Sequence, residues 1–314
     1  MGRPSSRHVA IDARVSAGSS NGTPSRVDLH AHTLRSDGLL TPAELVRAAA
    51  DAGVRLLAIT DHDTLAGYRE LAKRPEAMPA AIELLPGVEI NAMTGDDPRL
   101  ADNELHVLGL GVDPANEAFE ALLARQRAGR RVRFEKMIER LAGLGLDLRE
   151  ALERTAGPGH PGRPSEDHDA LGRPTVGRAL IAIGAVATVE EAFDRYLSRG
   201  RPGYVARKGI GPYEAIRAIN AAGGLASLAH FWSAAERPDV ITELIDAGLR
   251  GIEVHHLSFE PATVEAVGEV ARRFRLVATA GTDYHGDLGT YAEAHARLDV
   301  PPALEAEVRA VLGR

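Results

Sequence analysis

The sequence predicts an α/β barrel, a closed and mainly parallel sheet surrounded by helices. Short apolar segments with strand character alternate with amphipathic helical segments, a pattern typical of parallel sheets. The chain has 314 residues, a length at which α/β barrels often form one domain. Histidines and carboxylates recur at the ends of the proposed strands, where such barrels carry their chemistry.

The composition limits the chemistry that the protein can use. There are no cysteines, which excludes disulfides, thiolate metal ligands and a cysteine nucleophile. The formal net charge of −7 argues against indiscriminate nucleic-acid binding, although it leaves room for a local basic surface. No apolar run is long enough to span a bilayer. Residues 1–25 lack the apolar stretch of a signal peptide, so we expect a flexible extension there and a cytoplasmic protein without membrane contact.

The first part of the barrel is predicted at residues 26–115. Its first strand ends near His32, and Thr41 then caps a helix that starts at Pro42, with Glu44 as the reciprocal partner in a capping box. This helix ends at Gly53. Further strands are predicted at 54–60, 82–90 and 105–112, with a helix at 64–73.

The alternation resumes in a second barrel segment, residues 205–314. Strands are predicted at 224–229, 251–255 and 276–280, and helices at 212–222, 239–247 and 261–274. Residues 116–204 break the rhythm, with a long charged helix at 117–144, a Gly- and Pro-rich loop at 157–164, and helices at 175–184 and 189–197. We interpret 116–204 as a mostly helical insertion that caps the substrate over the C-terminal mouth of the barrel.

Nine potential metal ligands lie at or near the ends of the proposed strands. Any one of these histidines would more often be an ordinary hydrogen-bonded imidazole, but their recurrence at strand ends indicates a metal site. His30 and His32 share one face of their strand, because side chains alternate along a strand. The set comprises His30, His32, Asp37, His62, Glu89, His106, His230, Asp283 and His285. His106 fits least well, because it is predicted near the start of its strand.

Nine donors exceed the needs of one ion, so we expect two or three divalent cations bridged by a carboxylate, for which Glu89 is the natural candidate. A set made only of nitrogen and oxygen donors suits Mn²⁺, Fe²⁺ or Zn²⁺. A water that bridges two cations is largely hydroxide near neutral pH, and the cations also hold phosphoryl oxygens. The predicted site therefore suits hydrolysis of a phosphoester without a covalent nucleophile.

Six strings resemble the motifs of the PHP (polymerase and histidinol phosphatase) family, in the family's order and spacing, over about residues 26–290. They are HAHT at 30–33, SDG at 36–38, ITDHD at 59–63, PGVE at 86–89, AH at 229–230 and GTDYH at 281–285. The resemblance implies a distorted, TIM-barrel-like (β/α)7 barrel, a trinuclear metal centre with manganese as the first candidate, and phosphoester hydrolysis.

The insertion and the strings GRP at 172–174 and GYV at 203–205 look most like one branch of this family. That branch removes the 3′-phosphate from nucleoside 3′,5′-bisphosphates, and some of its members trim RNA from the 5′ end. We therefore expect a phosphatase for a small nucleotide bisphosphate, with no obligate protein partner. The alternatives are a 5′-to-3′ exoribonuclease on short RNA, a histidinol-phosphate phosphatase, which generally lacks such an insertion, and a non-catalytic metal-binding module.

Two departures from the branch affect substrate recognition. Phe231-Trp232 stands where relatives often have proline after the histidine, and Thr175 stands where they often have histidine. Trp232 could line a pocket for a base or cap the core. Both departures lie near the expected substrate and leave the metal ligands intact, so they put the identity of the substrate in doubt.

Arginines are the candidates for binding a second phosphate. Arg130 and Arg133 lie one helical turn apart, and the resemblance places them in an Arg-x-x-Arg pattern of the family. With Arg173 they could bind phosphate in bidentate fashion. The alternative is a solvated basic face paired with Glu135 and Glu139.

Other residues near the motifs have two interpretations. Asp63 is a catalytic candidate that could assist the leaving oxygen, and it could instead orient a metal ligand. His255 and His256 follow a predicted strand, but the ligand set is already complete, which favours a structural or orienting role.

The bridging role of Glu89 yields a direct prediction. Glu89→Ala should abolish turnover, because the variant lacks the carboxylate expected to join the cations. Phosphate release by the metal-loaded variant measures this, and near-normal activity would contradict the bridging role.

Overall fold

The computed structural model describes residues 26–95, 97–100, 104–155, 172–287 and 289–313. The extension predicted at 1–25 and the loop predicted at 157–164 lie outside these residues. In the described part of the chain, no helix is long and apolar enough to cross a membrane.

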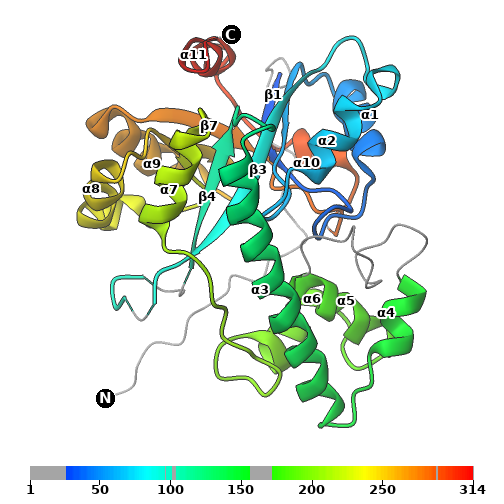
Figure 1. Ribbon diagram of the computed structural model, residues 1–314. Coiled ribbons are helices and arrows are strands. Elements are labelled where there is room, and N and C mark those ends of the chain that lie inside the picture. Colours follow the sequence, from blue (N-terminus) through cyan, green and yellow to red (C-terminus); the bar gives the residue numbers. More distant parts are fainter. Residues whose placement is uncertain (1–25, 96, 101–103, 156–171, 288, 314) are drawn as a thin grey trace.

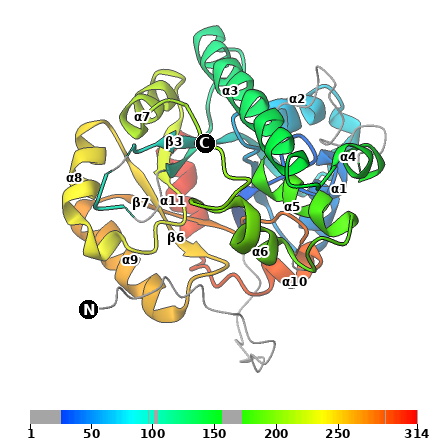
Figure 2. The same cartoon turned by 90° about the horizontal axis from the view of Figure 1, so that it is seen from below.

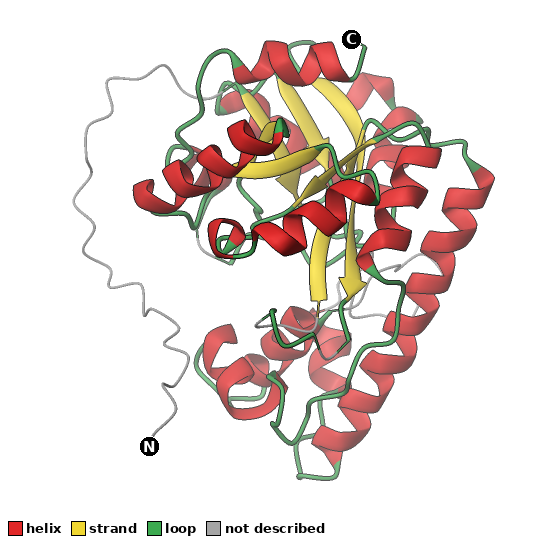
Figure 3. Cartoon of the chain, turned by 90° about the vertical axis from the view of Figure 1, so that its left-hand side faces the viewer, coloured by secondary structure: helices red, strands yellow, loops and turns green. Residues whose placement is uncertain are grey.

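Seven strands form one mixed sheet that curls into a nearly closed barrel, and neighbouring strands follow one another in chain order (Figure 3). The strands are β1 (Val27–Ala31), β2 (Leu56–Ile59), β3 (Glu83–Met93), β4 (Glu104–Leu110), β5 (Leu225–Leu228), β6 (Gly251–His256) and β7 (Val277–Gly281). The predicted barrel is thus confirmed.

The sheet is mainly parallel, as predicted, and β4 is the one strand that runs in the opposite direction. This strand is antiparallel to both β3 and β5, whereas the other neighbouring pairs are parallel. The start of β4 therefore lies at the edge of the barrel where the parallel strands end. His106, near the start of β4, consequently lies with the other candidate ligands.

A buried carboxylate closes the barrel between β1 and the segment after β7. Asp28 accepts hydrogen bonds from the Thr282 amide (3.0 Å), the Thr282 hydroxyl (2.7 Å) and the Tyr291 hydroxyl (2.7 Å). The Asp283 amide also donates to the His30 carbonyl (2.7 Å), and the His32 amide to the Tyr284 carbonyl (3.0 Å). A charge buried without partners would be costly, so this network holds the two edges together.

Helices surround the sheet on its outer face, as the view along the barrel in Figure 2 shows. They are α1 (Pro42–Asp51), α2 (Ala66–Ala72), α7 (Pro212–Ala221), α8 (Pro238–Asp246), α9 (Pro261–Phe274) and α10 (Tyr291–His295), with short 3-10 turns η1 (Pro75–Ala77) and η3 (Ala234–Glu236). Helix α11 (Leu304–Val311) lies across one end of the barrel instead (Figure 2). Helix α1 starts with the predicted capping box between Thr41 and Glu44. Leu304 and Val308 of α11 pack against residues at the N-terminal ends of the parallel strands, which leaves the C-terminal mouth for chemistry.

A second group of helices lies beyond the C-terminal mouth and is reached through the long α3 (Glu117–Ala142) (Figure 1). It comprises α4 (Arg149–Thr155), α5 (Arg173–Ala182), α6 (Val189–Ala192) and a π-helical turn η2 (Phe193–Leu197). Its apolar side chains form a cluster of their own around Met137, Leu141 and Leu180. Helices α3 and α5 can therefore present side chains toward the barrel from a separately packed body.

The closure network predicts a specific effect on stability. Tyr291→Phe should lower the free energy of unfolding by about 1–2 kcal/mol, because it removes one hydrogen bond to a buried charged acceptor. Chemical denaturation measures this. The control is Tyr213→Phe, which loses a hydrogen bond to Glu243 at a partly exposed position and should cost about 0.5 kcal/mol or less. Equal effects of the two substitutions would contradict the closing role of Asp28.

Candidate metal centre and substrate cavity

The nine predicted ligands converge at the C-terminal mouth of the barrel, around the buried carboxylate of Glu89. One oxygen of Glu89 lies 2.8 Å from His62 Nδ1, 3.3 Å from His32 Nε2 and 3.5 Å from His30 Nε2. The other oxygen lies 2.6 Å from His106 Nδ1 and 3.3 Å from His230 Nε2. A single carboxylate thus contacts ligand candidates from five different segments of the barrel.

Two aspartates complete the cluster on either side. Asp283 Oδ1 lies 3.2 Å from His30 Nε2 and 3.1 Å from His32 Nε2. Asp37 approaches His285 Nε2 at 3.3 Å and His62 Nε2 at 3.5 Å. No predicted ligand lies outside the cluster.

Unpartnered polar atoms test whether this cluster fits cations. Five buried atoms in it make no hydrogen bond to any described residue: His30 Nε2, His32 Nε2, His62 Nδ1, Asp37 Oδ1 and Glu89 Oε2. Buried polar atoms are normally paired, because desolvation without a partner is costly. Each atom is a good ligand for a divalent cation, so the residues fit a metal centre.

The donor atoms form overlapping groups, and within each group they lie within 4.8 Å of one another. The groups are His32 with Asp37, His62 and His285; Glu89 with His106 and His230; and His30 with either His32 and Asp283 or Glu253 and His256. More than one cation position is therefore compatible with the geometry.

Glu253, on β6, orients two ligand candidates and was missed from the sequence. Its Oε1 lies 3.1 Å from His30 Nδ1, and its Oε2 accepts the His230 amide at 2.8 Å. When His30 is neutral, as a metal ligand must be, this contact places the ring proton on Nδ1 and turns the lone pair of Nε2 toward the cluster. The only sequence signal is a carboxylate between the apolar residues Ile252 and Val254 of this strand.

His256 lies beside the candidate ligand Asp283. Its Nδ1 accepts the Ser258 amide at 3.2 Å, and its Nε2 lies 3.5 Å from Asp283 Oδ2 without a hydrogen bond to any described residue. His256 also belongs to the donor group of His30 and Glu253, so its position is compatible with an orienting role or with a ligand role. Its neighbour His255 belongs to none of the donor groups.

The backbone is strained at three positions of this site. Asp63, His230 and Asp283 have left-handed φ values of 54°, 31° and 49°, which non-glycine residues rarely adopt. Gly281 is needed for a different reason, since a Cβ there would lie 2.2 Å from His30 Cβ. Such strain persists only where surrounding contacts hold it, and it concentrates at functional sites.

Carboxylates control the protonation of the histidines. Burial alone would lower the pKa of His62, but the charges of Asp37 and Glu89 outweigh it and raise that pKa to about 10. Burial would also lower the pKa of His285, but the charges of Asp37 and Asp283 outweigh it and raise that pKa to about 9. The histidines in turn hold the pKa of Glu89 well below its ordinary value against the effect of burial. In the metal-free cluster, His62 and His285 are therefore imidazolium ions at neutral pH, and Glu89 is an ionised carboxylate.

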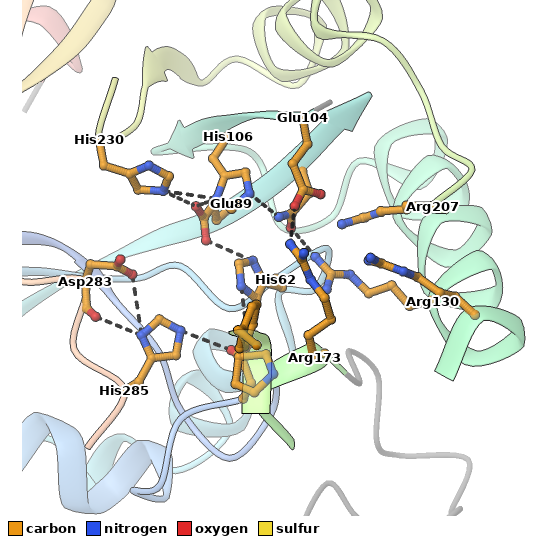
Figure 4. Close-up of a pocket in the computed structure, with 16 residues that line it drawn as sticks. His62, Glu89, Glu104, His106, Arg130, Arg173, Arg207, His230, Asp283 and His285 are labelled. Carbon is orange, nitrogen blue, oxygen red and sulfur yellow. Dashed lines mark hydrogen bonds and ion pairs between the residues drawn. The ribbon is translucent and has the colours of Figure 1, made fainter. Parts of the chain in front are cut away.

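The cluster forms one wall of a cavity, and four arginines, Arg130, Arg133, Arg173 and Arg207, line the other (Figure 4). Arg130 and Arg133 come from α3, and Arg173 begins α5. Arg207 was missed from the sequence, because it lies in an irregular segment without any motif. The three predicted arginines thus face the same cavity as the candidate ligands.

Asp63 lies behind the arginines and is fully buried. It accepts hydrogen bonds from Arg130 (2.5 Å) and Arg207 (2.6 Å). Burial raises the pKa of Asp63, but the two guanidinium groups outweigh it and bring that pKa below its ordinary value. The Asp63 carboxylate is ionised and accepts hydrogen bonds from two arginines, so its contacts suit the positioning of these arginines; no hydrogen bond joins its side chain to a described candidate metal ligand. Arg130 also donates to Asn91, whose amide contacts His106.

The two departures noted in the sequence have different environments. Phe231 is buried in the core, whereas Trp232 is 61% exposed and is not among the residues that line the cavity. Trp232 therefore neither caps the core nor lines this cavity. Thr175 is buried in α5, close to the cavity residues Arg173 and Pro174.

A barrel with clustered histidines and carboxylates at its mouth, beside an arginine-lined cavity, defines a metal-dependent phosphoesterase. The family model described as PHP domain matches residues 28–146. The 5′-3′ exoribonuclease Rnm of Salmonella typhimurium is 34% identical over 263 residues, which are 82% of this chain and 84% of the relative. The chain therefore belongs to the PHP family.

Two further proteins resemble the chain over most of its length. The 3′,5′-nucleoside bisphosphate phosphatase of Chromobacterium violaceum is 33% identical over 284 residues, which are 88% of this chain and 93% of that protein. A solved structure from Bifidobacterium adolescentis, named as a metal-dependent phosphoesterase, has a TM-score of 0.75 and 29% identity. The match covers 93% of this chain and 100% of the chain in that structure.

Metal binding should release protons and strengthen as the pH rises. Cations require neutral imidazoles, whereas the pKa values of His62 and His285 are about 10 and about 9 without metal. At pH 7 we expect roughly two or more protons released per chain, measured by calorimetric titration of the metal-free protein in buffers of different ionisation enthalpy. Binding without proton release at pH 7 would contradict this electrostatic account.

The same pKa shifts predict the stability of the metal-free protein. His62 and His285 have a higher pKa in the folded protein than the value of about 6.5 that they have in the unfolded chain. Each therefore stabilises the fold fully at a pH below 6.5, and this contribution is lost as the pH rises through their folded pKa values of about 9 and about 10. The metal-free protein should therefore unfold at lower denaturant concentration at pH 10 than at pH 6.5.

Proposed function

We propose that this phosphoesterase removes the 3′-phosphate from a nucleoside 3′,5′-bisphosphate. The observation that supports this proposal most strongly is a single cavity with the cluster of candidate metal ligands on one wall and four arginines on the other. Such a cavity suits a small molecule with two anionic groups, one at each wall. The relative from Chromobacterium violaceum bears the name of this activity.

We further propose that the nine converging residues hold two or three divalent cations, with Mn²⁺ as the first candidate and Fe²⁺ or Zn²⁺ as alternatives. When bound, such cations supply an activated water and neutralise charge on the phosphoryl oxygens. Glu253 and His256 orient His30 and Asp283, so that the donor atoms of these ligands face the cluster.

The arginine wall positions the substrate for hydrolysis. Arg130, Arg133 and Arg173 would bind the 5′-phosphate and so hold the 3′-phosphate against the cluster. The oxygen of a water bonds to phosphorus, the bond between phosphorus and the 3′-oxygen breaks, and a proton from that water ends on the 3′-oxygen. The products are inorganic phosphate and the nucleoside 5′-monophosphate with a 3′-hydroxyl group. Asp63 keeps Arg130 and Arg207 in place.

The insertion at 116–204 would cap the substrate. It supplies three of the four cavity arginines and Phe193, whose ring packs under the Arg173 guanidinium at 5.1 Å. These side chains complete a cavity that the barrel alone would leave open on the arginine side.

A second candidate is a 5′-to-3′ exoribonuclease on short RNA. The relative named exoribonuclease Rnm matches the chain as well as the phosphatase does. Arg131 and Lys208 are exposed next in sequence to the cavity arginines Arg130 and Arg207, which adds positive charge beyond the cavity.

A substrate panel tests the proposal. Phosphate release by Mn²⁺-loaded protein is compared for nucleoside 3′,5′-bisphosphates, monophosphates, histidinol phosphate and short 5′-phosphorylated RNAs. The proposal requires the highest kcat/KM for the bisphosphates. Nucleotide ladders from RNA at a higher kcat/KM would favour the exoribonuclease, and cleavage of no phosphoester would favour a non-catalytic module.

Arg130→Ala should raise KM for bisphosphates by about tenfold or more, because a charge-assisted contact to the second phosphate is lost. Monophosphates should be affected much less. The matched control is Arg131→Ala, which removes an exposed arginine from the next position on the same helix. An equal effect of Arg130→Ala on the KM for bisphosphates and for monophosphates would contradict a role of Arg130 in binding the second phosphate.

A further inference from the structure

The arginine wall of the cavity contains one carboxylate, Glu104. This residue begins β4, two positions before the candidate ligand His106, so both side chains can lie on the same face of the strand. The Arg173 guanidinium donates to Glu104 Oε1 at 2.7 Å, and the Glu104 side chain is 15% exposed. Glu104 therefore lies at the boundary between the metal cluster and the arginine wall, as Figure 4 shows.

A buried carboxylate in a phosphate-binding cavity is unexpected, since it repels the ligand. The Arg173 guanidinium pairs with the Glu104 carboxylate at 2.7 Å, and this ion pair favours the charged form of Glu104. The carboxylate is therefore ionised and can only accept hydrogen bonds. Among the described residues its one hydrogen-bond donor is Arg173, which contacts a single oxygen.

We propose that Glu104 determines sugar specificity by accepting a hydrogen bond from the ribose 2′-hydroxyl. The inference rests on the proposed function. A 3′,5′-bisphosphate that spans the two walls has its ribose between them, at the level of Glu104. The 2′-hydroxyl is the sugar's hydrogen-bond donor beside the 3′-phosphate. The second Glu104 oxygen accepts no hydrogen bond from any residue that the structure describes, so it can accept one from this hydroxyl.

This arrangement selects substrates in two ways. A 2′-deoxy substrate leaves a buried charged acceptor unpaired, and a site built to bind a hydroxyl group rejects analogues that lack it. A 2′-phosphate is repelled by the Glu104 charge. The enzyme should therefore prefer ribonucleotides with a free 2′-hydroxyl.

The test compares adenosine 3′,5′-bisphosphate with its 2′-deoxy analogue for the native chain, Glu104→Ala and Glu104→Gln. The native chain should prefer the ribonucleotide by about tenfold or more in kcat/KM. Glu104→Ala should abolish the preference, and Glu104→Gln, which keeps an oxygen acceptor, should retain part of it. Calorimetric binding of both bisphosphates should show the same ratios.

Three results would overturn the proposal. The first is a native chain that cleaves both sugars equally. The second is a Glu104→Ala variant that loses activity on both sugars by the same factor, which would mean that Glu104 only holds Arg173. The third is a native chain that hydrolyses p-nitrophenyl phosphate but neither bisphosphate. This third result also overturns the proposed function, whereas the first two leave that function intact.

Discussion

The buried carboxylate of Glu89 is the constraint on which the mouth of the barrel depends. Its two oxygens contact imidazoles from β1, β4 and the segments that follow β1, β2 and β5. Imidazoles and carboxylates at these distances leave several buried donor atoms without hydrogen bonds. Cations remove this cost, so metal binding and the geometry of the barrel mouth stabilise each other.

Other parts of the fold keep the candidate ligands together at the mouth of the barrel. The Asp28 network holds β1 beside the segment that carries Asp283 and His285, and α11 covers the opposite end of the barrel. The helices beyond the mouth bring Arg130, Arg133 and Arg173 to the cavity. Ion pairs hold Arg130 and Arg207 to Asp63, and Arg173 to Glu104. Positive charge thus faces the cluster of candidate ligands across the cavity.

Much of this could be predicted from local patterns. The bounds of α9 and the Thr41–Glu44 capping box follow from helix periodicity and end signals, and the structure confirms both. The nine ligand candidates were recognised because parallel strands end at one edge of a sheet. Their roles as ligands stay a prediction, while their convergence is observed.

What could not be predicted depends on contacts between distant segments. The antiparallel direction of β4 follows from its pairing partners, and local sequence does not encode it. Glu253 and Arg207 carry no motif, and their partners His30 and Asp63 lie far away in the chain. The exposure of Trp232 likewise depends on how the turn after His230 packs.

Anomalous diffraction from crystals grown with Mn²⁺ tests the central claim most directly. The account predicts manganese peaks bonded to Glu89 and to histidines on both sides of it, with Asp37 or Asp283 in the same coordination shells. Full manganese occupancy elsewhere, with no peak among these side chains, would contradict it.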